Sequence, residues 1–142
     1  MADDAWIQAL RGIDLFADLP ADAQRRVAEE MKEYRYGAGD VIVKQGQGGQ
    51  HGRMFVLLEG TAEADVDGTV VSTYQAGEHF GEMSLLDGGP RSATVTATTD
   101  VVLAGLVSWN LRSVLVEEPS IAVHLIEVLA GRLRKANAQV DD

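Results

Sequence analysis

The sequence predicts a mainly β domain with helical ends, its strands forming an antiparallel sandwich or barrel. The first observation is a rhythm, because short β-branched segments alternate with glycine about every eight to twelve residues through the middle of the chain. The second is the apolar spacing near both ends, which is typical of helices. The third is the length, since 142 residues of which 46% are hydrophobic suit one domain with one core.

Residues 1–36 are predicted to form an N-terminal helical cap. Trp6, Leu10 and Ile13 recur at helical spacing, and a second apolar face follows over residues 22–32. The glycine-punctuated pattern replaces this spacing at residue 37, so we expect the cap to end there.

Residues 37–107 are predicted to form the β region. Asp67-Gly68 lies between two β-branched segments, and this pair is a strong hairpin signal because both residues tolerate the positive φ of a two-residue turn. The strands are expected at Val41–Val43, Met54–Leu58, Thr61–Val66, Thr69–Tyr74, Ala93–Thr98 and Val101–Val107.

Residues 108–139 are predicted to form two C-terminal helices. Ser108 suits the N-cap of the first helix, and Pro119 separates it from the second. Arg132 follows Leu129 by one helical turn, at the edge of an apolar stripe, and is expected to point toward the β region. The stripe consists of Ile121, Leu125, Val128 and Leu129.

The composition argues against several classes of function. The chain has no cysteine and its three histidines are scattered, so no disulfide framework or zinc site is expected, and we interpret His51 and His79 as ordinary solvated or packed residues. The net charge of −10 opposes binding to nucleic acid, which needs a basic surface. No apolar segment is long enough for a membrane span and no signal peptide is recognisable, so we expect a cytoplasmic protein with no nucleic-acid or membrane partner.

Residues 77–95 contain the side chains that suggest a ligand-binding site. Their glycines allow close backbone approach, and residues 82–86 are expected to form one helical turn whose unpaired N–H groups suit an anion. Arg91 adds a guanidinium that can bind two phosphate oxygens. Glu82 would be badly placed beside a phosphate but suits a hydroxyl donor such as a ribose 2′-OH. The two side chains together fit a sugar joined to a phosphate.

This segment resembles the phosphate-binding cassette of the cyclic-nucleotide-binding domain family. Phe80-Gly81-Glu82 and Pro90-Arg91-Ser92-Ala93-Thr94-Val95 match the family pattern position by position. Upstream, residues 37–42 and 54–60 look like the early strands of the family. The resemblance therefore covers nearly the whole chain.

The fold that the resemblance implies is an antiparallel, jelly-roll-like β-roll. It would have N-terminal helices, a short helix inside the cassette at residues 80–95 and two C-terminal helices. Residues 1–142 would then form a single domain.

The resemblance also implies a role for each residue of the cassette. Glu82 would accept the ribose 2′-OH, and Arg91 would bind the cyclic phosphate. Backbone or hydroxyl groups would complete the phosphate cradle at Gly81, Ser84 and Ser92. The pocket wall would be supported by Phe80, Met83 and Ala93.

A residue of the last helix often covers the base in this family. Arg132 suits this role because a guanidinium can stack on the face of a purine. The alternative is that Arg132 only belongs to a basic face with Arg134 and Lys135, which complements the helix dipole.

Two positions depart from the family pattern. Relatives usually have an acidic residue just before the equivalent of Met54-Phe55, where it couples the phosphate arginine to the neighbouring loop, whereas this chain has Gly52 in a longer glycine-rich loop. The usual relay is thus absent or rerouted. Ser84 replaces the more common alanine, which adds a hydroxyl and should be tolerated.

The leading functional hypothesis is a non-enzymatic regulatory module that binds cAMP, with cGMP as the second choice. Its output would pass through the C-terminal helices to an unknown protein effector or to a second copy of the chain. The alternative is a β-roll interaction domain that no longer binds nucleotide. An enzyme of the cupin type, also a β-roll, comes third because the histidines are not spaced as a metal triad.

Overall fold

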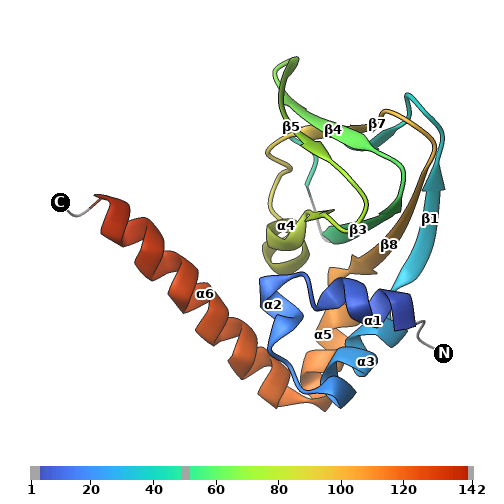
Figure 1. Ribbon diagram of the computed structural model, residues 1–142. Coiled ribbons are helices and arrows are strands. Elements are labelled where there is room, and N and C mark those ends of the chain that lie inside the picture. The colour runs from blue at the N-terminus through green and yellow to red at the C-terminus, as the bar shows by residue number, and fades with distance from the viewer. Residues whose placement is uncertain (1–3, 49–51, 141–142) are drawn as a thin grey trace. The chain divides into compact units, whose positions relative to one another are not determined.

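The computed structural model describes residues 4–48 and 52–140, without the side chains of residues 139 and 140. The chain forms two compact units (Figure 1). One unit spans Glu30–Leu111 and contains the strands, and the other combines the residues up to Glu29 with those from Arg112 onward and is helical.

The β unit consists of two four-stranded antiparallel sheets. The strand order is β1-β8-β3-β6 in one sheet and β2-β7-β4-β5 in the other. A short helix, α4 (Glu82–Asp87), follows β6. The strands are β1 (Lys32–Tyr36), β2 (Val41–Val43), β3 (Arg53–Glu59), β4 (Ala62–Val66), β5 (Thr69–Tyr74), β6 (His79–Phe80), β7 (Thr94–Ala97) and β8 (Val101–Val107).

The predicted strands and the predicted helical turn are confirmed. All six expected strands are present, and β2, β5 and β8 have the expected bounds. The hairpin between β4 and β5 turns at Asp67 and Gly68, with φ of 54° and 86°, while Val66 pairs with Thr69. Both turn positions require a positive φ, which Asp and Gly adopt more readily than most residues.

The prediction of a helical cap over residues 1–36 is wrong at its end. Lys32–Tyr36 forms β1, which pairs antiparallel with β8 from Lys32↔Gly105 to Tyr36↔Val101. Tyr34 lies edge-on against Phe55 with ring centroids 5.4 Å apart. The segment alternates polar and aromatic residues, so pairing with a buried strand places Tyr34 and Tyr36 against the core and overrides local helix propensity.

An aromatic cluster forms the centre of the β unit. Phe80 of β6 lies 5.5 Å from Phe55 and 5.1 Å from Tyr74, measured between ring centroids. Phe55 and Phe80 are buried and also pair across β3 and β6. This packing fixes the residues directly before α4. The two-residue strand β6 was not predicted, because it is too short to show a periodic pattern.

The helical unit contains α1 (Asp4–Leu10), α2 (Asp14–Ala17), α3 (Ala21–Glu29) and α6 (Pro119–Val140), and α5 (Ser108–Glu117) passes into it from the β unit. Buried Gln24 of α3 donates to the carbonyls of Phe16 and Ala17 at 3.0 and 3.1 Å, which fixes the end of α2. The predicted stripe of α6 is confirmed in its first half, since Ile121 and Leu125 are buried, whereas Val128 and Leu129 are half-buried. No described helix is long and apolar enough to cross a membrane.

Candidate functional site

A pocket of about 250 Å³ lies in the β unit beside the loop between β2 and β3. Its apolar lining comes from Ile42, Val43 and Phe55. Three cationic side chains also line it, namely Lys44, Arg53 and Arg91. The remaining lining residues are Gln47, Gly48, Gly52 and Ser84. In a chain with a net charge of −10, this pocket is a local cluster of positive charge.

Arg91 is held by main-chain hydrogen bonds on both sides. Its N–H donates to the carbonyl of Gln47 at 2.8 Å, and its own carbonyl accepts from the N–H of Gly46 at 2.9 Å. These contacts join the segment after α4 to the β2–β3 loop. The backbone that presents the guanidinium to the pocket is therefore fixed.

The guanidinium of Arg91 is half-buried and bound to a main-chain oxygen. Its Nη1 donates to the carbonyl of Arg53 at 2.9 Å. Among residues 4–48 and 52–140 no carboxylate forms an ion pair with it. Burial lowers the pKa of Arg91 from its ordinary value, and the positive charge of Arg53 lowers it further. An arginine remains protonated at neutral pH, so this cation is available to an anionic ligand.

Two glycines allow close backbone approach, one at Arg91 and one at Ser84. Gly81 has φ of 89°, and a Cβ there would lie 2.5 Å from the carbonyl oxygen of Arg53 and 2.6 Å from Nη1 of Arg91. Gly52 is buried, and a Cβ there would lie 1.6 Å from the carbonyl oxygen of Ser84. Position 52 thus has no room for the acidic side chain of the family pattern, and Arg91 contacts a main-chain carbonyl instead.

Glu82 is the first residue of α4 and pairs with a histidine. Its Oε2 lies 2.7 Å from Nε2 of His79, and the exposed fractions of the two side chains are 21% and 25%. From the sequence, His79 was interpreted as an ordinary residue. Only the turn at Gly81 brings its side chain close to Glu82, three positions later. Glu82 follows Gly81, where an added Cβ would lie 2.6 Å from the guanidinium of Arg91, but Glu82 is not among the residues that line the pocket.

The other predicted residues of the cassette occupy different environments. Ser84 lines the pocket. Phe80 packs in the aromatic core and supports Phe55, which lines the pocket. Ala93 is half-buried against the same core. The side chains of Met83 and Ser92 are exposed.

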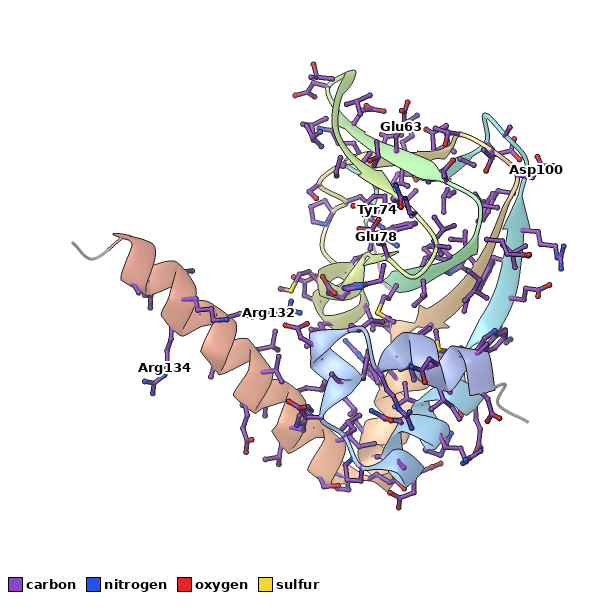
Figure 2. The ribbon with its side chains drawn as sticks, viewed as in Figure 1. Glu63, Tyr74, Glu78, Asp100, Arg132 and Arg134 are labelled. Atoms are coloured by element: carbon purple, nitrogen blue, oxygen red, sulfur yellow. The ribbon has the colours of Figure 1, made fainter. Side chains whose placement is uncertain are left out.

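Arg132 belongs to the helical unit, where it pairs with Asp14 of α2. Its Nε donates to Oδ2 of Asp14 at 3.1 Å, and its Nη2 bonds to Oδ1. Figure 2 shows Arg132 and Arg134 on different sides of α6. Arg132 thus differs from exposed Arg134 and Lys135 in having an acidic partner within its own unit. Its predicted contact with the base stays a prediction.

Sequence reasoning missed the cationic and polar residues on the loop side of the pocket. Lys44 and Arg53 lie at the two ends of the β2–β3 loop, and Gln47 and Gly48 lie within it. A signal was present, because a basic residue stands on each side of a glycine-rich stretch. His51 falls outside the described residues.

Comparison with known proteins identifies the family to which the chain belongs. Residues 33–118 match the family described as "Cyclic nucleotide-binding domain". A cAMP-dependent protein kinase regulatory subunit of Aspergillus fumigatus is 41% identical over 101 residues, which cover 68% of this chain and 24% of that protein. The chain therefore spans about a quarter of that relative's length.

Solved structures agree with the fold. The N-terminal domain of a transcriptional regulator from Streptomyces coelicolor A3(2) has a TM-score of 0.83 at 32% identity, covering 93% of this chain and 94% of that one. The cAMP-bound PfPKA-R (141–441) has a TM-score of 0.69 at 27% identity, covering 98% of this chain and 48% of that one. The predicted β-roll with helices at both ends is thereby confirmed.

Proposed function

Because this chain belongs to the cyclic nucleotide-binding domain family, we propose that it is a cytoplasmic regulatory module that binds cAMP and signals through its C-terminal helix. The observation that carries the proposal is the guanidinium of Arg91, which lines the pocket beside two other cations and lacks a carboxylate partner among the described residues. A cyclic phosphate would supply the missing negative charge. The family match also supports a binding domain rather than an enzyme.

In this proposal Arg91 binds the cyclic phosphate and Glu82 accepts the ribose 2′-OH. Lys44 and Arg53 add positive charge at the same pocket, and Ser84, Ser92 and Gly81 complete the cradle. The apolar lining, which includes Phe55, is suited to the less polar parts of the ligand.

The choice of cAMP over cGMP rests on two kinds of support. The relative from Aspergillus fumigatus is the regulatory subunit of a cAMP-dependent kinase, and PfPKA-R was solved with cAMP. In addition, Ser92 stands where cGMP-selective members of the family typically have threonine. Binding of cGMP with higher affinity would reverse this choice.

Signalling would use a shift between two arrangements of the helical unit. We expect Arg132 to leave Asp14 and stack on the base when nucleotide binds, so that the ligand favours one of the two arrangements. No catalytic step and no metal ion is part of this mechanism.

We propose that α6 passes the signal on by binding α6 of a second copy of the chain. Its exposed side chains follow the three-four spacing of a coiled-coil seam, on positions outside the buried stripe: Val123, Ile126, Ala130, Leu133 and Asn137. Val123, Ile126 and Leu133 are 55%, 64% and 62% exposed. A single asparagine in such a seam is a known determinant of register. This spacing favours a helix with the same pattern over a partner of unrelated shape.

The test of the binding proposal is isothermal titration of cAMP, and separately cGMP, into protein from which nucleotide has been removed. Arg91→Ala is the test variant, and Arg35→Ala is the matched control, because Arg35 is an exposed arginine of the same unit outside the pocket. Micromolar or tighter binding that is lost only in Arg91→Ala supports the module. No heat with either nucleotide, in folded and empty protein, would instead support the interaction domain without ligand.

A further inference from the structure

A second cationic pocket, of about 360 Å³, lies at one end of the sheet β1-β8-β3-β6. Its lining comes from the first residues of β1 and β3, the last residue of β8 and the first turn of α5, namely Lys32, Arg53, Val107, Trp109 and Asn110. All five residues belong to the β unit. The pocket is therefore built within a single unit of the chain.

The sheet register places the two cations of this pocket on one face. Lys32 pairs with Gly105 across β1 and β8, and Arg53 pairs with Val107 across β3 and β8. Paired residues point to the same face, and side chains alternate along a strand, so these two pairs, which lie two residues apart along β8, share one face. Lys32 and Arg53 thus stand on either side of β8 at its end.

Neither cation is neutralised by the part of the chain that the structure describes. Among residues 4–48 and 52–140 no carboxylate forms an ion pair with Lys32 or Arg53. The guanidinium of Arg53 instead lies over the ring of Tyr34, with 5.4 Å between Cζ and the ring centroid. This contact orients the guanidinium without cancelling its charge. In a chain with a net charge of −10, the pocket keeps a local positive charge.

Trp109 adds a large apolar surface beside these charges. It is 63% exposed in the first turn of α5. Tryptophan and arginine are both enriched at the hot spots of protein interfaces, where an aromatic anchor carries much of the binding energy. A neutral or basic partner would desolvate the two cations without supplying a counter-charge, which is costly. The combination therefore favours an acidic partner that also carries an apolar side chain.

We propose that Lys32, Arg53 and Trp109 form a docking surface for an acidic segment of an effector protein. Carboxylates of that segment pair with the two cations, and one of its apolar side chains packs against the indole. The inference goes beyond the proposed function, because it adds a protein partner at a surface outside α6 and does not require a bound nucleotide.

The test is a display selection of random short peptides against the full chain. We expect the selected peptides to be enriched in aspartate and glutamate and to contain a large apolar residue. A selected peptide is then labelled with fluorescein, and its anisotropy during titration with the full chain gives the affinity. Replacing its carboxylates by amides should weaken binding, and so should added salt, because both reduce the charge attraction.

Variants of the full chain locate the bound peptide. Trp109→Ala should weaken binding at least about tenfold, because it removes the aromatic anchor. Lys32→Glu should weaken it at least about threefold, because an attraction becomes a repulsion. Arg35→Glu is the matched control and should have no effect, since Arg35 is exposed on the opposite face of β1. Thermal melting of each variant shows whether the fold is intact.

The outcomes separate this surface from the nucleotide pocket, which Arg53 also lines. Lys44 lines the nucleotide pocket only. If Lys44→Glu weakens the peptide and Lys32→Glu does not, the peptide occupies the nucleotide pocket and the docking surface is rejected. The proposal is also overturned by a selection that yields no binder, by binders without an excess of acidic residues, or by binding that Trp109→Ala leaves unchanged. None of these results changes the outcome of the cAMP titration, so the two proposals can fail separately.

Discussion

Nη1 of Arg91 donates a hydrogen bond to the main-chain carbonyl of Arg53, 38 positions earlier in the chain, at 2.9 Å. A carbonyl orients a guanidinium without neutralising it, whereas a carboxylate would do both. The rerouted contact follows from Gly52, where the backbone packs too closely on Ser84 for any side chain. Arg91 is therefore positioned and still fully charged toward the pocket.

Replacing Arg91 should cause the largest loss of nucleotide binding. We expect Arg91→Ala to cost about 2 to 4 kcal/mol, a factor of roughly 30 to 1,000, because it removes a charge-assisted contact to phosphate. Titration calorimetry measures this loss. Unchanged affinity in a folded variant would reject the assignment of the phosphate site.

Replacing Glu82 should cost less than replacing Arg91. The hydroxyl that Glu82 accepts can be partly rehydrated when the carboxylate is removed, whereas the phosphate loses a fixed cation. The same titration of Glu82→Ala checks this order of effects. A loss larger than that of Arg91→Ala would mean that the two roles are reversed.

A methyl group at Gly81 should disturb the site more than one at a glycine of similar conformation elsewhere. Gly81→Ala would place Cβ within 2.6 Å of both the Arg53 carbonyl and Nη1 of Arg91. Gly39 has φ of 91°, and a Cβ added there would have no atom within 4 Å. Gly39→Ala should therefore lower the free energy of unfolding only by the cost of the backbone conformation, about 1 to 2 kcal/mol.

Urea denaturation and cAMP titration of both variants make this comparison. Gly81→Ala should be the less stable of the two and should also bind more weakly. Equal stability and equal affinity would show that the close approach at Gly81 is not needed.

Weakening the contact between Asp14 and Arg132 should increase affinity if Arg132 covers the base. An ion pair of this exposure is worth about 0.2 to 1 kcal/mol, so Asp14→Asn should tighten cAMP binding by up to about fivefold. Arg132→Ala should weaken it. Glu117→Gln, which removes the acidic partner of Arg26 in the same unit, is the control and should have no effect. If Asp14→Asn and Arg132→Ala both leave affinity unchanged, Arg132 is a structural residue of α6 only.

A charge in the seam of α6 should prevent self-association. Sedimentation velocity of the wild-type protein should show a dimer that Ile126→Lys converts to a monomer, because a coiled-coil seam does not tolerate a buried like-charged pair. Val116→Lys is the control, since Val116 is 81% exposed on α5 and outside the seam. A monomeric wild-type protein with and without cAMP would redirect the search to a different partner.

The β region and its cassette could be predicted from the sequence because their signals are local. Alternation, glycine spacing and Asp67-Gly68 indicate strands and a turn from neighbouring residues alone. The pattern around Phe80-Gly81-Glu82 and Arg91 likewise needs no tertiary information. The family and the residues of the cassette can therefore be identified from the order of the amino acids.

The sequence-based predictions were wrong or incomplete mainly where a residue contacts partners that are distant in the chain. Lys32–Tyr36 became a strand because β8, about seventy residues later, offers an unpaired edge and a buried core. The environment of Arg91 depends on loop carbonyls and on Arg53, which no local pattern links to it. Even the nearby pair His79 and Glu82 required the turn at Gly81 to bring the side chains together.

Sequence alone thus determined the periodicities, the turns and the identity of the cassette, because these depend on properties of single residues and their neighbours. Tertiary structure decided which atoms face Arg91, why position 52 must be glycine and which side chain lies against Glu82. The physical reason is that hydrogen bonds and steric exclusion act over a few ångströms in space, and only the packing of β3, α4 and the β2–β3 loop brings those atoms within that range.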